Sequence, residues 1–373
     1  MKGWRPENPE EAVLSTCSTL ITIVEDKGSK TVQFSHFSVK EFLTSDRLQT
    51  SAFRNVRHYH IPLDVAHTTL ARLCFTMLLP PEEKVDEKRV KALPLAPYSA
   101  RHWVDHVKFE NVAPQFEDSM KRLFDPKKPH FKAWTQIYNI DDGGGSRQAT
   151  PLYYAVLCGF TSLAKRLVVA DAGDVNARCG HHRTPLHAAS YRGHLDTVRF
   201  LLDQGADVNT TIEGWRSPLC SAYEGDHLEV MRLLLERGAD ANVTYSAMRL
   251  LHYAALNGKI GILQLLLQHN AAVNAKIKEG NTPLYCASAR GQLDATQLLL
   301  DHGADVNSQT VELYTPLIIA SERGHLETVR VLLRHGANVH MRNIRNHTSF
   351  CKATRRGHVE VVQLLLDHGA ERE

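Results

Sequence analysis

Several features that would place a protein in a large class at once are missing from this sequence. The longest apolar runs, such as 77–81, are far too short to cross a bilayer, and no charged and then apolar leader opens the chain. The net charge of +3 is small for 373 residues, so it does not favour nucleic acid or an anionic membrane as a partner. We therefore expect a cytoplasmic, intracellular protein without membrane insertion and without a nucleic-acid partner.

Motifs that carry chemistry are also scarce. The seven cysteines form no CxxC pair, which indicates reduced thiols. No GxxxxGK[ST] phosphate loop, nucleophile elbow or His-Glu-x-x-His helix occurs. The cluster Cys179-Gly180-His181-His182 has no second cluster of suitable spacing to complete four zinc ligands. We therefore expect no catalytic residues, no metal ion, no cofactor and no small-molecule substrate, and hence no enzyme.

What the sequence does contain is repetition. The stretch TPLHAASYRGHLDTVRFLLDQGADVN, residues 184–209, returns with variations from residues 150, 217, 250, 282, 315 and 348. The Asn that closes it stands at 176, 209, 242, 274 and 307, spaced by 33, 33, 32 and 33 residues. Internal periods of this size predict a stacked array instead of a single wrapped core. A residue that occurs in every copy is a poor candidate for a unique active site.

Each copy predicts a short helix, a tight turn, a longer helix and an extended finger. Thr184 is placed to cap the first helix, and Pro185 suits its first turn. Gly193 ends that helix, because the chain must there take a left-handed turn. The second helix is expected from about Leu195 to Gln204, with Gly205 ending it. Helices this short are marginal alone, so they depend on packing against the next copy.

Ten of the 21 histidines recur at fixed positions of the repeat. They lie beside the turn glycine, before the end of the second helix, or after Thr-Pro-Leu; they are His194, His227, His325, His358, His269, His302, His335, His368, His187 and His252. Because recurrence explains them without chemistry, we interpret them as structural groups that cap carbonyls and bridge neighbouring repeats.

The elements TPLHAA, GH, a leucine-rich second helix and GADVN resemble the ankyrin repeat, with seven copies over residues 150–373. The resemblance implies a mainly α-helical solenoid of stacked helix pairs with hairpin fingers. Asp226 replaces the turn glycine, and Asn270 replaces a later glycine as a residue that tolerates the left-handed conformation. Arg249-Leu250 replaces Thr-Pro and Ser349 replaces Pro, so these copies are expected to be locally softer.

The first part of the chain does not repeat. We expect a partial winged-helix segment at 1–60, a helical connector at 61–141 and the repeats at 142–373. A hairpin is predicted from 20–24 and 31–34, followed by a helix for which Ser38 and Glu41 have capping-box spacing. Connector helices are predicted at 64–79, 96–107, 114–123 and 130–138. The helices within 114–138 are expected to cover the apolar face of the first repeat at Leu152 and Leu163.

The stretches QFSHFSVKEFLTS and PYSARHWVDHV resemble the segment that joins nucleotide-switching NACHT-type modules to ankyrin arrays in fungal proteins. The first of them is similar to the winged-helix domain named after GPI inositol-deacylases. Such switches need a phosphate loop, and this sequence has none. The resemblance therefore implies the output end of such an architecture without its NTPase.

The remaining candidate function is binding through the surface. In an ankyrin array the variable positions lie on the inner face before the turn glycine and at the finger tips. The candidate partner-binding residues are Tyr191, Arg192, Trp215, Glu224, Tyr245, Leu256, Asn257, Arg290, Tyr314, Glu322, Arg323, Arg355 and Arg356. Arg290, Arg323 and Arg356 form a row one repeat apart, which we expect to hold an acidic segment of a partner protein.

Other interpretations remain open. Arginine before the turn glycine is common in such repeats, and the finger aromatics could simply pack on adjacent fingers. The chain could be a sensor or output subunit of a NACHT-type switch, or bind DNA through the winged-helix segment, against which its balanced charge argues. The final helix, 359–368, is only weakly polar on its outer side, so further repeats, fraying or self-association are expected there.

Overall fold

The computed structural model describes residues 62–80, 95–137, 150–171, 174–179, 184–211 and 216–372, and the backbone of 21–26 and 29–34. The chain divides into two compact units, Met1–Ile140 and Asp141–Glu373. The helix predicted near Ser38, and with it most of the expected winged-helix segment, lies outside these residues.

The predicted hairpin is present in the first unit. Strand β1 (Ile21–Asp26) pairs antiparallel with β2 (Ser29–Phe34), so that Ile21 lies opposite Phe34 and Asp26 opposite Ser29. Glu25, Asp26, Ser29 and Lys30, which stand between the two predicted apolar runs, extend the two strands.

The four predicted connector helices are confirmed within a residue or two. They are α5 (Leu63–Leu78), α7 (Ala96–Lys108), α8 (Glu117–Leu123) with the 3-10 turn η2 (Ala113–Phe116) before it, and α9 (Pro129–Ile137). Their core is aromatic. The Trp103 and Trp134 rings meet edge to face at 5.5 Å, and Trp134 Nε1 donates to the Ala100 carbonyl at 3.0 Å. Both rings are fully buried, so this segment has a hydrophobic core of its own.

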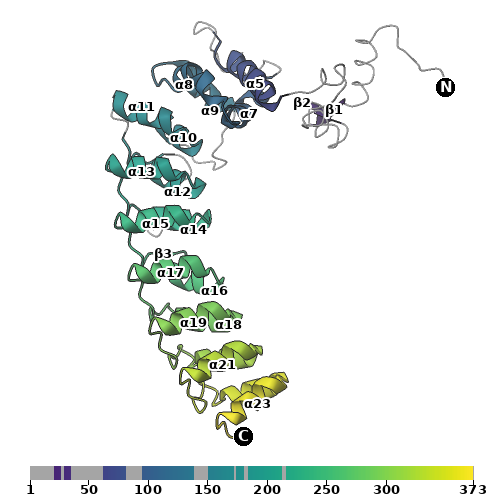
Figure 1. Ribbon diagram of the computed structural model, residues 1–373, viewed down its shortest axis with the longest axis vertical. Coiled ribbons are helices and arrows are strands. Elements are labelled where there is room, and N and C mark those ends of the chain that lie inside the picture. The colour runs from purple at the N-terminus through teal and green to yellow at the C-terminus, as the bar shows by residue number, and fades with distance from the viewer. Residues whose placement is uncertain are drawn as a thin grey trace, which may run out of the picture. The chain divides into compact units, whose positions relative to one another are not determined.

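The second unit is the predicted solenoid of seven helix pairs, stacked one on the next in Figure 1. The first helices are α10 (Pro151–Leu157), α12 (Pro185–Arg192), α14 (Pro218–Glu224), α16 (Leu250–Leu256), α18 (Pro283–Arg290), α20 (Pro316–Arg323) and α22 (Ser349–Arg356). The second helices are α11 (Thr161–Asp171), α13 (Leu195–Asp203), α15 (Leu228–Glu236), α17 (Ile260–Gln268), α19 (Leu293–Asp301), α21 (Leu326–Arg334) and α23 (Val359–Asp367). One finger carries a short hairpin, β3 (Thr244–Tyr245) with β4 (Met248–Arg249).

The ends of the first helices follow the predicted rules. The hydroxyl of Thr184 accepts a hydrogen bond from the His187 amide, and the equivalent Thr or Ser caps the first helix of every other repeat except the fourth. There Arg249 makes no side-chain cap. Asp226 and Asn270 have φ of 60° and 61°, so both take the left-handed conformation expected of the glycines that they replace.

Polar ladders bind each repeat to the next. The Asn209 amide donates to the Gly238 carbonyl at 3.0 Å, and its oxygen accepts from the Asp240 amide at 2.9 Å. The same pair of bonds recurs at Asn176, Asn242, Asn274 and Asn307. Each Asn therefore satisfies two backbone groups of the following repeat, which explains why the finger keeps this residue.

The histidines beside the turn glycine form a second ladder and have the predicted structural role. His227 Nε2 contacts the Tyr191 carbonyl at 3.0 Å and His358 Nε2 the Glu322 carbonyl at 3.1 Å, each one repeat back. Their rings pack on the turn glycine of the preceding repeat, where a Cβ on Gly193 or Gly324 would lie 2.5 or 2.6 Å from ring atoms. A glycine and the histidine of the next repeat thus form one contact.

The ladder changes where the turn glycine is missing. Lys259 stands at the histidine position of the fourth repeat, and its Nζ donates to Asp226 Oδ1 at 2.5 Å. Asp226 is the residue that replaces the turn glycine, so both partners differ from the other repeats together. An ion pair has replaced the packing of a ring on a glycine.

We predict that Asp226 and Lys259 are energetically coupled. The variants Asp226→Gly and Lys259→His each remove the ion pair, whereas the double variant recreates the glycine–histidine contact. We expect the two substitutions to be non-additive by about 1 kcal/mol in a double-mutant cycle. Urea unfolding of the four proteins measures this coupling, and additive effects would show that the two residues act independently.

The first repeat buries the residues expected to be covered. Leu152 and Leu163 are 3% and 6% exposed, so neither shows the exposed apolar face that would count against a cover. That helices within 114–138 supply the cover stays a prediction.

Candidate partner-binding surface

The inner face of the solenoid is formed by the last residues of the first helices. The array curves towards the side on which these helices lie (Figure 1). Arg192, Arg290, Arg323 and Arg356 each end such a helix, and all four side chains are exposed. Since these helices pack side by side, their final residues line one continuous surface.

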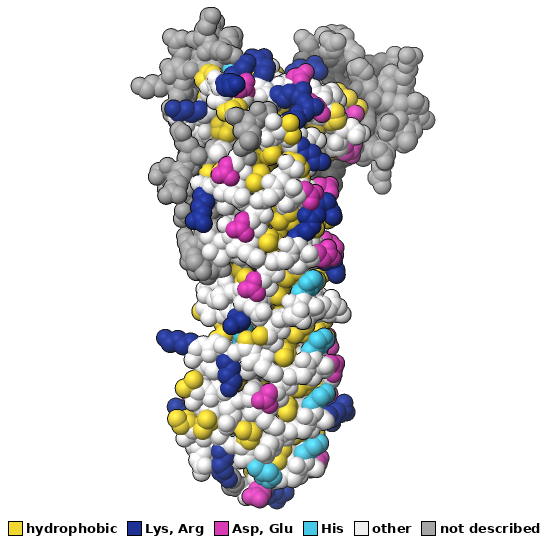
Figure 2. Space-filling model, turned by 90° about the vertical axis from the view of Figure 1, so that its left-hand side faces the viewer, with side chains coloured by type: hydrophobic (Ala, Val, Ile, Leu, Met, Phe, Trp, Pro, Cys, Tyr) yellow, Lys and Arg dark blue, Asp and Glu magenta, His cyan; other side chains and the backbone are white. Residues whose placement is uncertain are grey.

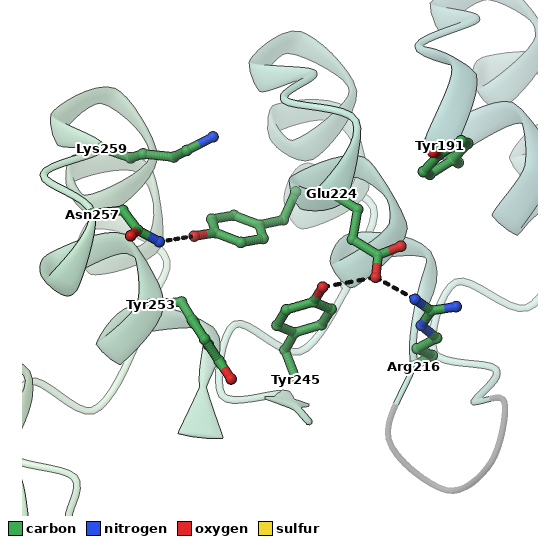
Figure 3. Close-up of a pocket in the computed structure, with 8 residues that line it drawn as sticks. Tyr191, Arg216, Glu224, Tyr245, Tyr253, Asn257 and Lys259 are labelled. Carbon is green, nitrogen blue, oxygen red and sulfur yellow. Dashed lines mark hydrogen bonds and ion pairs between the residues drawn. The ribbon is translucent and has the colours of Figure 1, made fainter. Parts of the chain in front are cut away.

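Among the residues that the structure describes, this surface includes two hollows, and the first is rich in tyrosine. It has a volume of about 540 Å³ and spans repeats two to four. We call it the tyrosine hollow. It is lined by Tyr191, Arg216, Tyr223, Glu224, Tyr245, Tyr253, Asn257 and Lys259 (Figure 3).

Glu224 is the centre of the tyrosine hollow. Its Oε1 accepts hydrogen bonds from the Arg216 guanidinium and, at 2.8 Å, from the Tyr245 hydroxyl. Burial, the hydrogen bond to Glu224 and the charge of Glu224 raise the pKa of Tyr245 to about 12, so this hydroxyl remains a donor. The carboxylate is therefore held in place by two fingers.

The tyrosine rings hold one another. Tyr245 meets Tyr223 and Tyr253 edge to face, with centroids 5.8 and 5.1 Å apart. Asn257 Nδ2 donates to the Tyr223 hydroxyl at 3.2 Å, and Lys259 Nζ lies 5.2 Å from the Tyr223 centroid. Tyr245 thus packs on tyrosines of the first helices α14 and α16, and not on an adjacent finger as one interpretation expected, and it still lines the hollow.

The second hollow, the basic hollow, belongs to repeats five to seven. It has a volume of about 680 Å³ and is lined by Ala289, Arg290, Ile319, Glu322, Arg323, His325, Arg356 and His358. Within the described part of the chain, Arg290 and Arg323 form no ion pair. Burial lowers the pKa of His325, so arginine supplies the positive charge here.

The one acid of the basic hollow is already neutralised. Glu322 Oε1 accepts from Lys352 Nζ and from an Arg356 guanidinium nitrogen, both at 3.3 Å. Burial opposes the ionised form, but the charge and hydrogen bond of Lys352 outweigh it, and the pKa of Glu322 is lowered. Tyr314 lies beneath this group, with Lys352 Nζ 5.1 Å from its centroid. The hollow therefore keeps a positive balance.

The structure brings together some of the predicted binding residues and not others. Four of them, Tyr191, Glu224, Tyr245 and Asn257, line the tyrosine hollow, and four more, Arg290, Glu322, Arg323 and Arg356, line the basic hollow. Arg192, Leu256, Tyr314 and Arg355 line neither, and Trp215 lies outside the described residues.

Sequence reasoning missed Tyr223, Tyr253 and Lys352. Tyr223 stands where other repeats have Ser190, Ser288 or Ser321, so a large ring at a small-residue position was the available signal. Tyr253 and Lys352 share another position, which holds Ala188 in the second repeat. These departures from the residue that other repeats have at the same position were the sequence signal for a site at the base of the fingers.

Other kinds of site find no support among the residues that the structure describes. In those residues no group of three or more His, Cys, Asp or Glu could hold a metal ion, and no helix is long and apolar enough to cross a membrane. Cys179 is a buried thiol, while Gly180, His181 and His182 lie outside the described ranges. On the face in Figure 2, acidic and basic side chains are interspersed, and histidines follow one another in a column.

Comparison with known proteins gives relatives that match part of the chain. Azaphilone pigments biosynthesis cluster protein L of Monascus ruber is 32% identical over 219 residues, covering 52% of this chain and 46% of that protein. Alpha-latrocrustotoxin-Lt1a of Latrodectus tredecimguttatus is 41% identical over 56 residues, covering 15% of this chain and 4% of the toxin. The chain thus matches less than half the length of either relative.

The family is identified by repeat models and by a solved structure. The human ASB11 ankyrin repeat domain is 28% identical, with a TM-score of 0.52, and covers 60% of this chain and all of that domain. Models of ankyrin repeats in three copies match residues 128–212, 152–245, 219–310 and 308–372, which together cover more than half of the chain. The chain belongs to the ankyrin-repeat family.

Proposed function

We propose that this protein is a non-catalytic scaffold that binds a partner protein through the inner face and fingers of its array. Ankyrin repeats are generally protein interaction modules, and the hollows described above lie on the surface that such modules offer. A stable interface needs about 800 Å² from each partner, which several neighbouring repeats can supply. We further propose that it acts in the cytoplasm without a cofactor or small-molecule substrate.

The observation that carries this proposal is the positive balance of the basic hollow. Arg290 and Arg323 are exposed and unpaired within the described residues, while Lys352 and Arg356 neutralise Glu322. Exposed arginine guanidinium groups bind carboxylates in bidentate fashion, through two parallel hydrogen bonds. The proposed partner therefore presents an acidic segment to repeats five to seven.

Charge reversal tests this proposal. The triple variant Arg290→Glu/Arg323→Glu/Arg356→Glu should weaken capture of the partner at least about tenfold, and most strongly at low salt, because charge attraction is screened by ions. The full chain serves as bait, and each captured protein is compared between wild type and variant by quantitative mass spectrometry.

A matched control reverses three exposed arginines on the second helices. Arg199→Glu/Arg232→Glu/Arg334→Glu changes the net charge equally but leaves the inner face intact. Partners lost from the first variant and retained by the control support the inner face. Equal loss from both variants would overturn the proposal.

A second candidate function follows from the resemblance of the front end. We propose as the alternative that residues 1–60 are a partial winged-helix segment and 61–141 a connector, as in the output part of a fungal NACHT-type switch. The hairpin β1–β2 and the helix α7, which contains PYSARHWVDHV, support it. A phosphate loop encoded upstream, or a co-purified nucleotide-binding subunit, would favour this alternative. DNA binding through the same segment is a third candidate, and filter binding across salt concentrations tests it.

A further inference from the structure

The arginines of the basic hollow form a row with a regular step. Arg290, Arg323 and Arg356 are the last residues of α18, α20 and α22, and each precedes its turn glycine. They therefore occupy one register position on three adjacent helices. Helices in contact lie about 8–10 Å apart, so the arginines stand in a row with about that step.

The conformation of an occupant follows from that step. A polyproline II segment rises about 3.1 Å per residue with three residues per turn, so every third side chain returns to one face after about 9 Å. In a β-strand, side chains three apart point to opposite faces. An α-helix needs about six or seven residues to cover the same distance. In a β-strand the side chains that share a face are two residues and about 7 Å apart, which is shorter than the step. Among extended segments the polyproline II repeat therefore matches the row best.

The neighbouring surface favours the same conformation. No described residue that lines the basic hollow is a tyrosine, but the tyrosine hollow lies on the same inner face, in repeats two to four, and offers aromatic side chains to a proline-containing segment that continues beyond the basic hollow. Its charges are paired internally, because Glu224 binds Arg216 and Lys259 binds Asp226. The unneutralised positive charge that is available to bind a partner therefore lies in the basic hollow.

We propose that the basic hollow binds an extended, acidic, proline-containing segment of another protein, in polyproline II conformation, with carboxylates at every third residue. One carboxylate meets each of the three arginines; Arg356, one nitrogen of which binds Glu322, meets its carboxylate through its remaining N–H groups. Glu322 does not compete for Arg290 or Arg323, because its carboxylate is held by Lys352 and Arg356. This inference rests on the proposed function and adds to it the spacing and conformation of the ligand.

Synthetic peptides of one composition test the spacing. Each of three peptides contains three Asp residues, and its other residues are Pro and Ala. The Asp residues stand at every third position in the first peptide, at every second position in the second, and consecutively in the third. Binding to the full chain is measured by fluorescence anisotropy at low salt. The every-third peptide should bind at least about tenfold more tightly than the other two, since only it can contact all three arginines at once.

A pairing experiment locates the middle contact. In the Arg323→Gln variant the every-third peptide should lose most of its advantage, and replacing its middle Asp by Asn should then cause no further loss. The control Arg334→Gln, on the second helix α21, should leave the ranking unchanged. Such coupling would place the middle carboxylate on Arg323.

The outcomes separate the two proposals. Equal binding of all three peptides, abolished by the triple charge reversal, would overturn the spacing while leaving the acidic groove intact. Tighter binding of a proline-free helical peptide with Asp at every seventh position would overturn the polyproline II conformation. If the chain bound none of the peptides but still captured its partner through the inner face, the proposal of an acidic ligand would itself be overturned.

Discussion

Gly324→Ala should lower the free energy of unfolding of the last two repeats by about 3 kcal/mol, although it adds a single methyl group. Gly324 has φ of 74°, and a Cβ there would lie 2.6 Å from ring atoms of His358. The substitution combines about 1–2 kcal/mol for the left-handed backbone with loss of the bond from His358 to the Glu322 carbonyl. The contact between repeats six and seven is thereby broken.

The chain contains a matched control for this effect. Gly357 occupies the same position in the last repeat, with φ of 77°, but a Cβ there would meet nothing within 4 Å. Gly357→Ala should therefore cost only the backbone term, about 1–2 kcal/mol. Hydrogen exchange of the amides in α22 and α23 measures both variants, because a solenoid loses its contacts repeat by repeat.

A second substitution separates the ring contact from backbone strain. In a chain that already carries His358→Ala, Gly324→Ala should cost no more than Gly357→Ala does in the wild type. If both glycine variants were equally destabilising in the wild type, the histidine ladder would contribute nothing between repeats.

The fold could be predicted because its determinants are local and repeated. Thr184, Pro185 and Gly193 fix the start and the end of a helix from within about ten residues, and the leucines of the second helix mark its buried side. The structure confirmed the resulting helices, with small shifts such as an end at Asp203 instead of Gln204. The non-repeating segment before residue 62 offered no such redundancy.

The binding surface could be predicted only in part, because it depends on contacts between repeats. The row of arginines follows from register alone. That Glu322 would be neutralised by Lys352, 30 residues later, requires knowing that α20 and α22 lie side by side with Tyr314 below. The pairing of Glu224 with Tyr245 and Arg216 likewise depends on where two fingers fold.

Acid should destabilise the array through a histidine that sequence and structure both assign to packing. His187 is fully buried, with Nδ1 2.7 Å from the Thr184 hydroxyl and Nε2 3.3 Å from the Arg216 carbonyl. Burial lowers the pKa of His187 to about 4; the charges of Arg178 and Arg216 act in the same direction, and the carbonyl and Asp207 oppose them. The folded chain therefore resists a proton that the unfolded chain accepts.

The direction of the pH effect follows from this shift. Between the unfolded pKa, about 6.5, and the folded value the unfolded state binds more protons, so stability is present above about pH 6.5 and falls as the pH is lowered. From about pH 7 to about pH 5 the contribution of His187 alone should fall by about 2 kcal/mol. Burial also lowers the pKa of His252, which should act in the same direction.

Urea unfolding of His187→Gln at both pH values measures this contribution. The variant should be about 1 kcal/mol less stable than wild type at about pH 7, because it loses hydrogen bonds to Thr184 and Arg216. It should lose about 2 kcal/mol less than wild type on acidification, so its stability approaches or exceeds that of wild type at about pH 5. His302→Gln, at an exposed position where Nδ1 contacts the Leu298 carbonyl at 2.8 Å, is the matched control for a histidine substitution on the surface. An unchanged pH dependence in His187→Gln would mean that this ring takes up its proton in the folded array as readily as in the unfolded chain.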